Sequence, residues 1–226
     1  MGVIYLVRHG QARAQAYGAG AWAQAQGGLT ELGQAQAAAT GRALAARCDR
    51  IDAAISGDLA RQRETLTTVL DVVAHEVVAR TDPRWNEYDI NTILSEHEQH
   101  VAGGGRELQR SLDTALSEWI TEVRAPSGRE SYGDYRRRCA EALDTVRGLA
   151  GPGQTAVVVS SAGTITQIVA QLWGVSGPRW QIMSRTMINA SVTKLIVGRG
   201  GVSVVSVNEH AHLESLDPDG SLMTFR

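Results

Sequence analysis

The sequence predicts an α/β fold, a three-layer sandwich in which helices flank both faces of a mostly parallel central sheet. Short apolar runs bounded by turn residues are typical of buried strands, and they occur at residues 3–7, 53–56, 155–159, 192–197 and 202–207. Between these runs the apolar residues recur at helical spacing. Alternation of strands and helices along a chain favours a sheet covered by helices.

Two helix starts can be assigned from side chains that accept hydrogen bonds from free N–H groups. Thr30 is expected to cap a helix that runs to about Arg47. Asp58 is expected to cap a second helix, whose apolar residues follow the i, i+3, i+4, i+7 spacing: Leu66, Val69, Leu70 and Val73. With 226 residues, the chain is long enough to bury the core of one domain covering residues 1–226.

Residues from about 90 to 130 interrupt the alternating pattern. This segment contains three consecutive glycines at 103–105, a helical stretch around Trp119 and a Pro-Ser-Gly loop at 126–128. We expect a helical excursion that covers the active-site end of the sheet as a cap. An inert helical insertion explains the same composition equally well.

Charge and composition exclude several classes of partner. The 22 basic and 24 acidic residues are spread along the chain and give a formal charge of −2, without a basic stripe for nucleic acid or a polybasic segment for a membrane. No charged leader precedes an apolar core, and no apolar run approaches the roughly twenty residues that span a bilayer. Cys48 and Cys139, each expected inside a helix, form neither a disulfide framework nor a metal-binding cluster. We therefore expect a cytoplasmic protein that binds a small soluble ligand.

Two arginines and a histidine follow predicted strands at the end of the sheet where open α/β folds bind ligands. Arg8 and His9 come directly after the first strand. Arg61 lies in the first turn of the helix that Asp58 would cap, where free N–H groups and the helix dipole also attract an anion. Together they predict a phosphate pocket, although each motif alone also occurs as ordinary surface side chains.

Several motifs in a fixed order resemble the histidine phosphatase superfamily, which includes the cofactor-dependent phosphoglycerate mutases. Leu-Val-Arg-His-Gly at residues 6–10 resembles its N-terminal signature, and residues 29–37 resemble its first helix entry. Further similar segments are residues 56–65, Trp85-Asn86-Glu87, Glu130-Ser131 followed by Arg138, and residues 208–213. The resemblance covers almost the whole chain.

This resemblance implies a phosphoryl-transfer mechanism for named residues. His9 would attack phosphorus as a neutral imidazole and form a phosphohistidine, while Arg8 and Arg61 would hold the phosphoryl oxygens. Glu87 would protonate the leaving oxygen and then take a proton from the hydrolytic water. Because the arginines supply the positive charge, neither a metal ion nor another cofactor is expected, and the partner would be a small phosphorylated substrate.

The chain departs from the family pattern after the later core strand. The family normally has a second histidine there, whereas this chain has Ser161, or Ala162 if the register shifts by one, and resembles a branch without that histidine. Ala12 and Gln15 stand where the family commonly has a small hydroxyl residue and an asparagine. We expect Ser161, the main-chain N–H groups of Ala162 and Gly163, and Gln15 to contribute to phosphate binding.

Two histidines near the C-terminal end are candidates to replace the missing imidazole. His212 matches the family block better, and His210 is the freer candidate. Our hypothesis is that one of them partly compensates. The alternative is that they bond backbone carbonyls and orient the loop.

These observations favour a metal-independent phosphomonoesterase that works through phosphorylated His9. A phosphoglycerate mutase is the alternative enzyme, but its bisphosphate needs a basic enclosure, and the excursion contributes only arginines 106, 110, 124 and 129 without a clear cluster. A phosphate-ligand binding protein with weakened chemistry is an alternative of another class. Monomer and homodimer both stay open, because the predicted edge strand at 202–207 could pair or remain capped.

Overall fold

The computed structural model describes residues 1–17, 27–74, 76–96, 105–121, 130–217 and 219–225. Its six-stranded sheet has the order β3-β2-β4-β1-β5-β6. The strands are β1 (Gly2–Arg8), β2 (Ala53–Ser56), β3 (Ala79–Thr81), β4 (Thr155–Ser160), β5 (Val192–Gly198) and β6 (Gly201–Glu209). Because only β5 runs antiparallel to its neighbours, the predicted mostly parallel sheet is confirmed. The exposed three-residue strand β3 was not predicted, since it lacks an apolar run.

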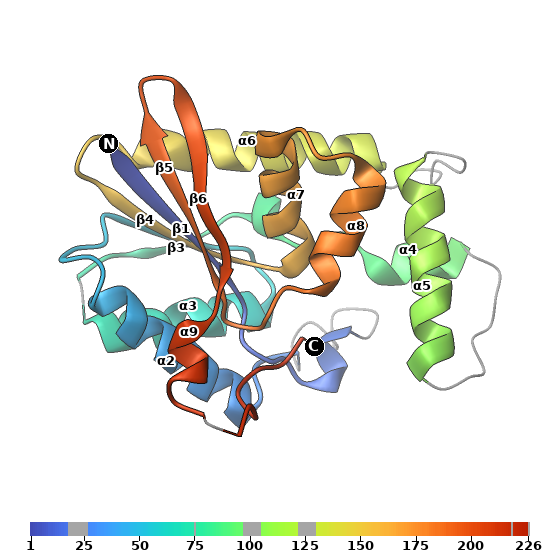
Figure 1. The fold of residues 1–226 in the computed structure, drawn as a ribbon, viewed down its shortest axis with the longest axis horizontal. Coiled ribbons are helices and arrows are strands. Elements are labelled where there is room, and N and C mark those ends of the chain that lie inside the picture. Colours follow the sequence, from blue (N-terminus) through green and yellow to red (C-terminus); the bar gives the residue numbers. More distant parts are fainter. Residues whose placement is uncertain (18–26, 75, 97–104, 122–129, 218, 226) are drawn as a thin grey trace.

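Helices cover both faces of the sheet and produce the predicted three layers (Figure 1). On one face lie α2 (Glu31–Ala45) and α3 (Ala60–Val73), which pack against each other. On the other lie α6 (Tyr132–Leu149), α7 (Ala162–Trp173) and α8 (Gly177–Arg185). The short helix α9 (Ala211–Glu214) contacts α2. None of the described helices is long and apolar enough to span a membrane.

The central strand β1 is buried on both sides. Ile4 and Leu6 belong to the core beneath α6 and α7, whereas Tyr5 and Val7 belong to the core beneath α3. This division follows from the strand pleat, which turns successive side chains to opposite faces. His9, the residue that follows β1, is therefore buried at the carboxyl end of the parallel strands.

The two expected helix caps have different outcomes. Thr30 caps α2, and its side chain accepts a hydrogen bond from the N–H of Gly33 at 3.0 Å, as predicted. The expectation for Asp58 is wrong, because α3 has Leu59 at its N-cap and no side-chain cap bond. Asn86, 28 residues away in the sequence, binds both the main-chain N–H and the carboxylate of Asp58.

The two cysteines also differ from each other. Cys139 is buried inside α6, as predicted. The expectation that Cys48 lies in a helix is wrong, because α2 ends at Ala45 and Cys48 follows it; its thiol donates to the carbonyl of Leu44. Both cysteines are free.

The excursion contains two helices, α4 (Ile90–Glu96) and α5 (Gly105–Ile120), and Figure 1 shows both beyond α8. Leu112, Leu116 and Trp119 of α5 pack into the same core as Ile4 of β1. The Trp119 ring also meets the rings of Tyr88, Tyr132, Tyr135 and Trp180. The described part of the excursion is thus attached to the main core. Gly103, Gly104 and the loop at 126–128 lie outside the described residues.

Candidate active site

His9 is fixed by main-chain bonds to two neighbouring segments. Its N–H donates to the carbonyl of Ser160 at 2.9 Å, and its carbonyl accepts from the N–H of Ala190 and the side-chain amide of Asn189 at 3.2 and 3.0 Å. In the imidazole, Nδ1 lies 2.7 Å from the carbonyl oxygen of Gly10. Because a carbonyl can only accept, Nδ1 carries the proton and Nε2 carries the lone pair.

Arg61 lies directly at this lone pair. It projects from the first turn of α3, and its Nε donates to Nε2 of His9 at 3.2 Å. Its Nη1 donates to the carbonyl of Ala16 at 3.1 Å. Burial lowers the pKa of His9 well below its usual value, and the positive charges of Arg61 and Arg8 lower it further. The imidazole is therefore neutral around pH 7.

Arg8 is positioned differently from Arg61. Its buried guanidinium donates to the main-chain carbonyls of Met187 and Phe225, the latter at 2.7 Å. The C-terminal segment that includes Phe225 is held in turn by Asn189, whose N–H donates to the carbonyl of Thr224 at 2.8 Å. Arg8 thus places a positive charge beside His9 while two of its nitrogens bind the main chain.

Glu87 follows a 3₁₀ turn, Pro83–Trp85, and its carboxylate reaches the start of α7. Oε2 accepts from the N–H of Gly163 at 2.8 Å, and Oε1 accepts from the hydroxyl of Tyr135 at 3.2 Å. These donors and the charge of Arg61 favour the ionised form, but burial outweighs them and raises the pKa of Glu87. Since Arg61 acts on the pKa of both His9 and Glu87, these three predicted residues lie in one site.

The turn after β4 brings Ser161 beside His9. Arg8 pairs with Ser160 across β1 and β4, so the residues that follow these strands are neighbours. The Ser161 hydroxyl oxygen accepts from Nε2 of Gln62 at 2.9 Å. Ala162 is the first residue of α7. The N–H of Gly163, which we expected to bind phosphate, is engaged by Glu87.

Three other predicted residues lie away from these contacts or outside the described part of the molecule. His212 Nε2 lies 3.1 Å from both the hydroxyl of Thr40 and the carbonyl of Ala190. His210 Nδ1 lies 2.6 Å from the carbonyl of Asn208. Both imidazoles therefore contact main-chain carbonyls, and no bond from either to His9 occurs among the described residues. The side chain of Gln15 is outside the described part of the structure.

Gln62 also lies in this region, beside Ser161, and is not among the residues predicted from the sequence. Its side chain is fully buried, on the face of α3 that also carries Leu66 and Val69. Gln62 stands four positions before Leu66 and seven before Val69, at the spacing of the apolar residues, and a polar residue at such a position was the available signal. Because buried polar groups need partners, such a residue indicates a specific interaction.

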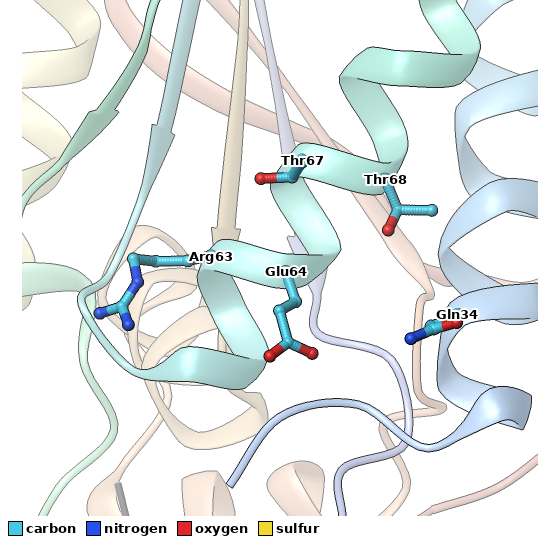
Figure 2. Close-up of a pocket in the computed structure, with 5 residues that line it drawn as sticks. All are labelled: Gln34, Arg63, Glu64, Thr67 and Thr68. Carbon is cyan, nitrogen blue, oxygen red and sulfur yellow. The ribbon is translucent and has the colours of Figure 1, made fainter. Parts of the chain in front are cut away.

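A pocket of about 420 Å³ lies on the opposite, outward face of α3. Figure 2 shows its lining side chains on the outer side of α3 and at the start of α2: Gln34, Arg63, Glu64, Thr67 and Thr68. Arg63 and Thr67 are exposed, whereas Arg61 and Thr65 of the same helix are buried. The pocket is thus separate from the surroundings of His9.

Arginine side chains supply the positive charge around His9. Among the residues that the structure describes, no three or more histidine, cysteine or acidic side chains are grouped to hold a metal ion. A neutral imidazole with its lone pair at a guanidinium, next to a carboxyl group of raised pKa, is a set of groups suited to phosphoryl chemistry. The fold and this site define a phosphoryl-handling class of α/β protein.

Comparison with known families gives the same class. The model of the histidine phosphatase superfamily (branch 1) matches residues 4–210, and the chain belongs to this family. No curated protein matches the sequence.

Solved structures share the fold at low sequence identity. YhfR from Bacillus stearothermophilus has a TM-score of 0.72 and 20% identity, with 94% of this chain and 99% of that chain covered. Mycobacterial glucosyl-3-phosphoglycerate phosphatase in complex with VO3 has a TM-score of 0.67 and 22% identity, with 93% and 100% covered. Phosphoglycerate mutase from Bacillus anthracis has a TM-score of 0.66 and 21% identity, with 93% and 94% covered. At such identities the likeness establishes the fold.

Proposed function

We propose that this protein is a metal-independent phosphomonoester hydrolase that works through a phosphohistidine on His9. The observation that carries the proposal is the imidazole itself: Nδ1 is bound to the Gly10 carbonyl, and the Nε2 lone pair faces the guanidinium of Arg61. This arrangement keeps a nucleophile unprotonated where a phosphoryl group would bind.

In the first step a phosphate ester replaces His9 as the partner of Arg61. The Nε2 lone pair forms a bond to phosphorus, and the bond from phosphorus to the ester oxygen breaks with its electron pair on that oxygen. Glu87, whose protonated form is favoured by burial, gives its proton to this oxygen and releases an alcohol. The Nδ1–H bond to the Gly10 carbonyl stabilises the positive ring that results.

In the second step water attacks the phosphohistidine. An oxygen–phosphorus bond forms, the phosphorus–nitrogen bond breaks, and its electron pair returns to Nε2 of His9. The Glu87 carboxylate takes a proton from the attacking water, so the enzyme regains its starting protonation state and inorganic phosphate leaves.

We further propose that the chain belongs to the members of its family that lack the second histidine, with Ser161 in its place. Ser161 directly follows Ser160, whose carbonyl accepts a hydrogen bond from the N–H of His9, and this position supports the assignment. The N–H of Ala162 at the start of α7, the charge of Arg8 and the side chain of Gln15 would complete the phosphate shell.

The hydrogen bonds to the Glu87 carboxylate come from neutral groups, which favours hydrolysis over mutase activity. Its described donors are the hydroxyls of Tyr135 and Thr164 and main-chain N–H groups. Arg61, which also serves His9, acts on the carboxylate through its charge, whereas a retained bisphosphate needs further basic residues. A binding protein with weakened chemistry is the alternative that the absent second histidine suggests.

Phosphate release from a generic aryl phosphate, measured for the wild type and His9→Ala, tests the proposal. We expect release and an acid-labile phosphoenzyme that are both lost with His9. Equal, negligible rates for the two proteins would favour the binding protein, and conversion of 3-phosphoglycerate with a trace of bisphosphate would favour the mutase. In parallel, unchanged turnover in His210→Ala would assign that imidazole to loop orientation.

A further inference from the structure

Gln62 donates two hydrogen bonds from a completely buried amide. Its Nε2 lies 3.2 Å from the carbonyl oxygen of Trp85 and 2.9 Å from the hydroxyl oxygen of Ser161. Trp85 lies two residues before Glu87, and Ser161 is the N-cap of α7. The amide therefore connects three segments of the proposed site: α3, the turn before Glu87 and the turn after β4.

The Trp85 carbonyl fixes the direction of these bonds. A carbonyl oxygen can only accept, so the NH₂ side of the Gln62 amide must face it. This oxygen also accepts from the Ser160 hydroxyl at 2.6 Å, which occupies its second lone pair. The remaining N–H of Gln62 then points at Ser161, whose hydroxyl oxygen has to act as the acceptor.

A serine hydroxyl has one hydrogen, and in Ser161 this arrangement leaves it for a further acceptor. Within the described residues, no acceptor for this hydrogen occurs. The residue is nevertheless almost fully buried, at 1% exposure, and its side chain makes no cap bond to α7. A buried donor of this kind is available to an atom of a bound ligand or to an ordered water.

The surroundings of Ser161 indicate which ligand atom completes it. Ser160, the preceding residue, binds the N–H of His9 through its carbonyl. Arg61 and Gln62 are consecutive, so one turn of α3 holds both the lone pair of His9 and the hydroxyl oxygen of Ser161. A phosphoryl group on His9 would bring its oxygens to this place.

We infer that Gln62 is a positioning residue, which directs the Ser161 hydroxyl to donate to an oxygen of the phosphoryl group at His9. The inference rests on the proposed function and extends it, because it names the device that takes over from the absent histidine. A donor that is already oriented stabilises developing charge without reorganisation. If Gln62 served only to connect the Trp85 turn to α3, the effect of its substitution on kcat would be the same whether or not Ser161 is present.

A double-mutant cycle on kcat distinguishes these two roles. Ser161→Ala removes the donor, and we expect it to lower kcat by about 10²-fold, the scale for one transition-state donor. Gln62→Met keeps the volume but frees the hydroxyl to rotate, and we expect a loss of about tenfold, equivalent to one hydrogen bond. In the Ser161→Ala background, Gln62→Met should cost less than about twofold.

An equal loss from Gln62→Met in both backgrounds would overturn the inference. Gln167→Met is the matched control, since this buried glutamine binds the hydroxyl of Tyr132 and not Ser161; its effect on kcat should be the same with Ser161 or alanine. If wild type turns over and requires His9 while the cycle is additive, only the inference fails. If wild type itself releases no phosphate, the proposed function fails first.

A second variant keeps the inference testable if Gln62→Met does not fold. Gln62→Glu retains the shape but places an oxygen where Nε2 of Gln62 stands. Whether the carboxyl group is ionised or gives its one hydrogen to the Trp85 carbonyl, this oxygen accepts the Ser161 hydrogen and turns it away from the phosphoryl group. We expect its loss in kcat to match that of Ser161→Ala and to shrink in the Ser161→Ala background. A general effect of negative charge would persist undiminished in that background and would contradict the inference.

Discussion

Gly163→Ala adds one methyl group beside the carboxylate of Glu87. A Cβ at this position would lie 2.4 Å from Oε1 of Glu87 and 2.7 Å from Cε1 of Tyr88. Ordinary contact begins at 3.4 Å, so the carboxylate has to move by about 1 Å (3.4 − 2.4). Misplacement of a reacting group by about 1 Å can lower a rate by about 10²-fold.

The loss should depend on the leaving group, because Glu87 is proposed to protonate the ester oxygen. An alkyl phosphate has a basic leaving oxygen and needs this proton, whereas a nitrophenyl phosphate leaves readily without it. We expect kcat of Gly163→Ala to fall by about 10²-fold for the alkyl ester, and by less than about tenfold for the nitrophenyl ester. Steady-state phosphate release with both esters measures the two values.

Gly148→Ala is the matched control, because it makes the same change in helix α6 where no atom lies within 4 Å. It should leave both rates unchanged and gain about 0.5–1 kcal/mol of helix stability. Equal losses for the two esters in Gly163→Ala, or an unchanged rate for the alkyl ester, would refute the placement of Glu87 as the proton donor.

Three further predictions concern charge. Arg61→Met should lower kcat by about 10²–10³-fold and raise the pKa of His9, which an NMR titration measures. An unchanged pKa of His9 would contradict the contact between Arg61 and the imidazole. In wild type, kcat should decrease as pH rises through the raised pKa of Glu87, because the acid then loses its proton. The pH profile of Glu87→Gln should lack this alkaline decrease. A decrease that persists in this variant would belong to another group. His9, buried neutral with a depressed pKa, should make the free energy of unfolding decrease as pH falls below about 6.5, and urea titrations of His9→Gln should give a smaller decrease.

The sequence could predict the residues that follow strands. His9 and Arg61 come after apolar runs whose carboxyl ends meet at one edge of the sheet, and Glu87 takes its place from the order of family motifs. Apolar residues that repeat every 2 or 3.6 positions indicate buried faces, so the sequence could also predict the two cores. The capping side chain of Thr30 indicated the start of α2.

Contacts between distant segments were beyond such patterns. Asp58 was predicted to be a cap from its place just before a helical pattern. Its actual partner, Asn86, is 28 residues away, and local spacing cannot indicate such a bond. Arg8 binds the main-chain carbonyls of residues 187 and 225. Because every residue has a main-chain carbonyl, the residue types at these positions do not indicate the contact. Gln62 was overlooked for the same reason, because one of its partners is a carbonyl and the other is 99 residues away.

Burial is the common cause of the protonation states that the proposed first step requires. The charge of Arg61 lowers the pKa of both His9 and Glu87, which favours a neutral imidazole but an ionised acid. Desolvation disfavours the charged form of each group, so it lowers the pKa of His9 and raises that of Glu87. Burial therefore favours the uncharged forms of the proposed nucleophile and of the proposed acid together.

Substrate binding would strengthen this arrangement at Glu87. The negative charge of a phosphate ester raises the pKa of a nearby carboxyl group and offsets the influence of Arg61. The acid then retains its proton until the ester bond breaks, when the departing oxygen becomes the stronger base. The hydroxyl of Ser161 is neutral, so it adds no positive charge that would oppose this effect on Glu87.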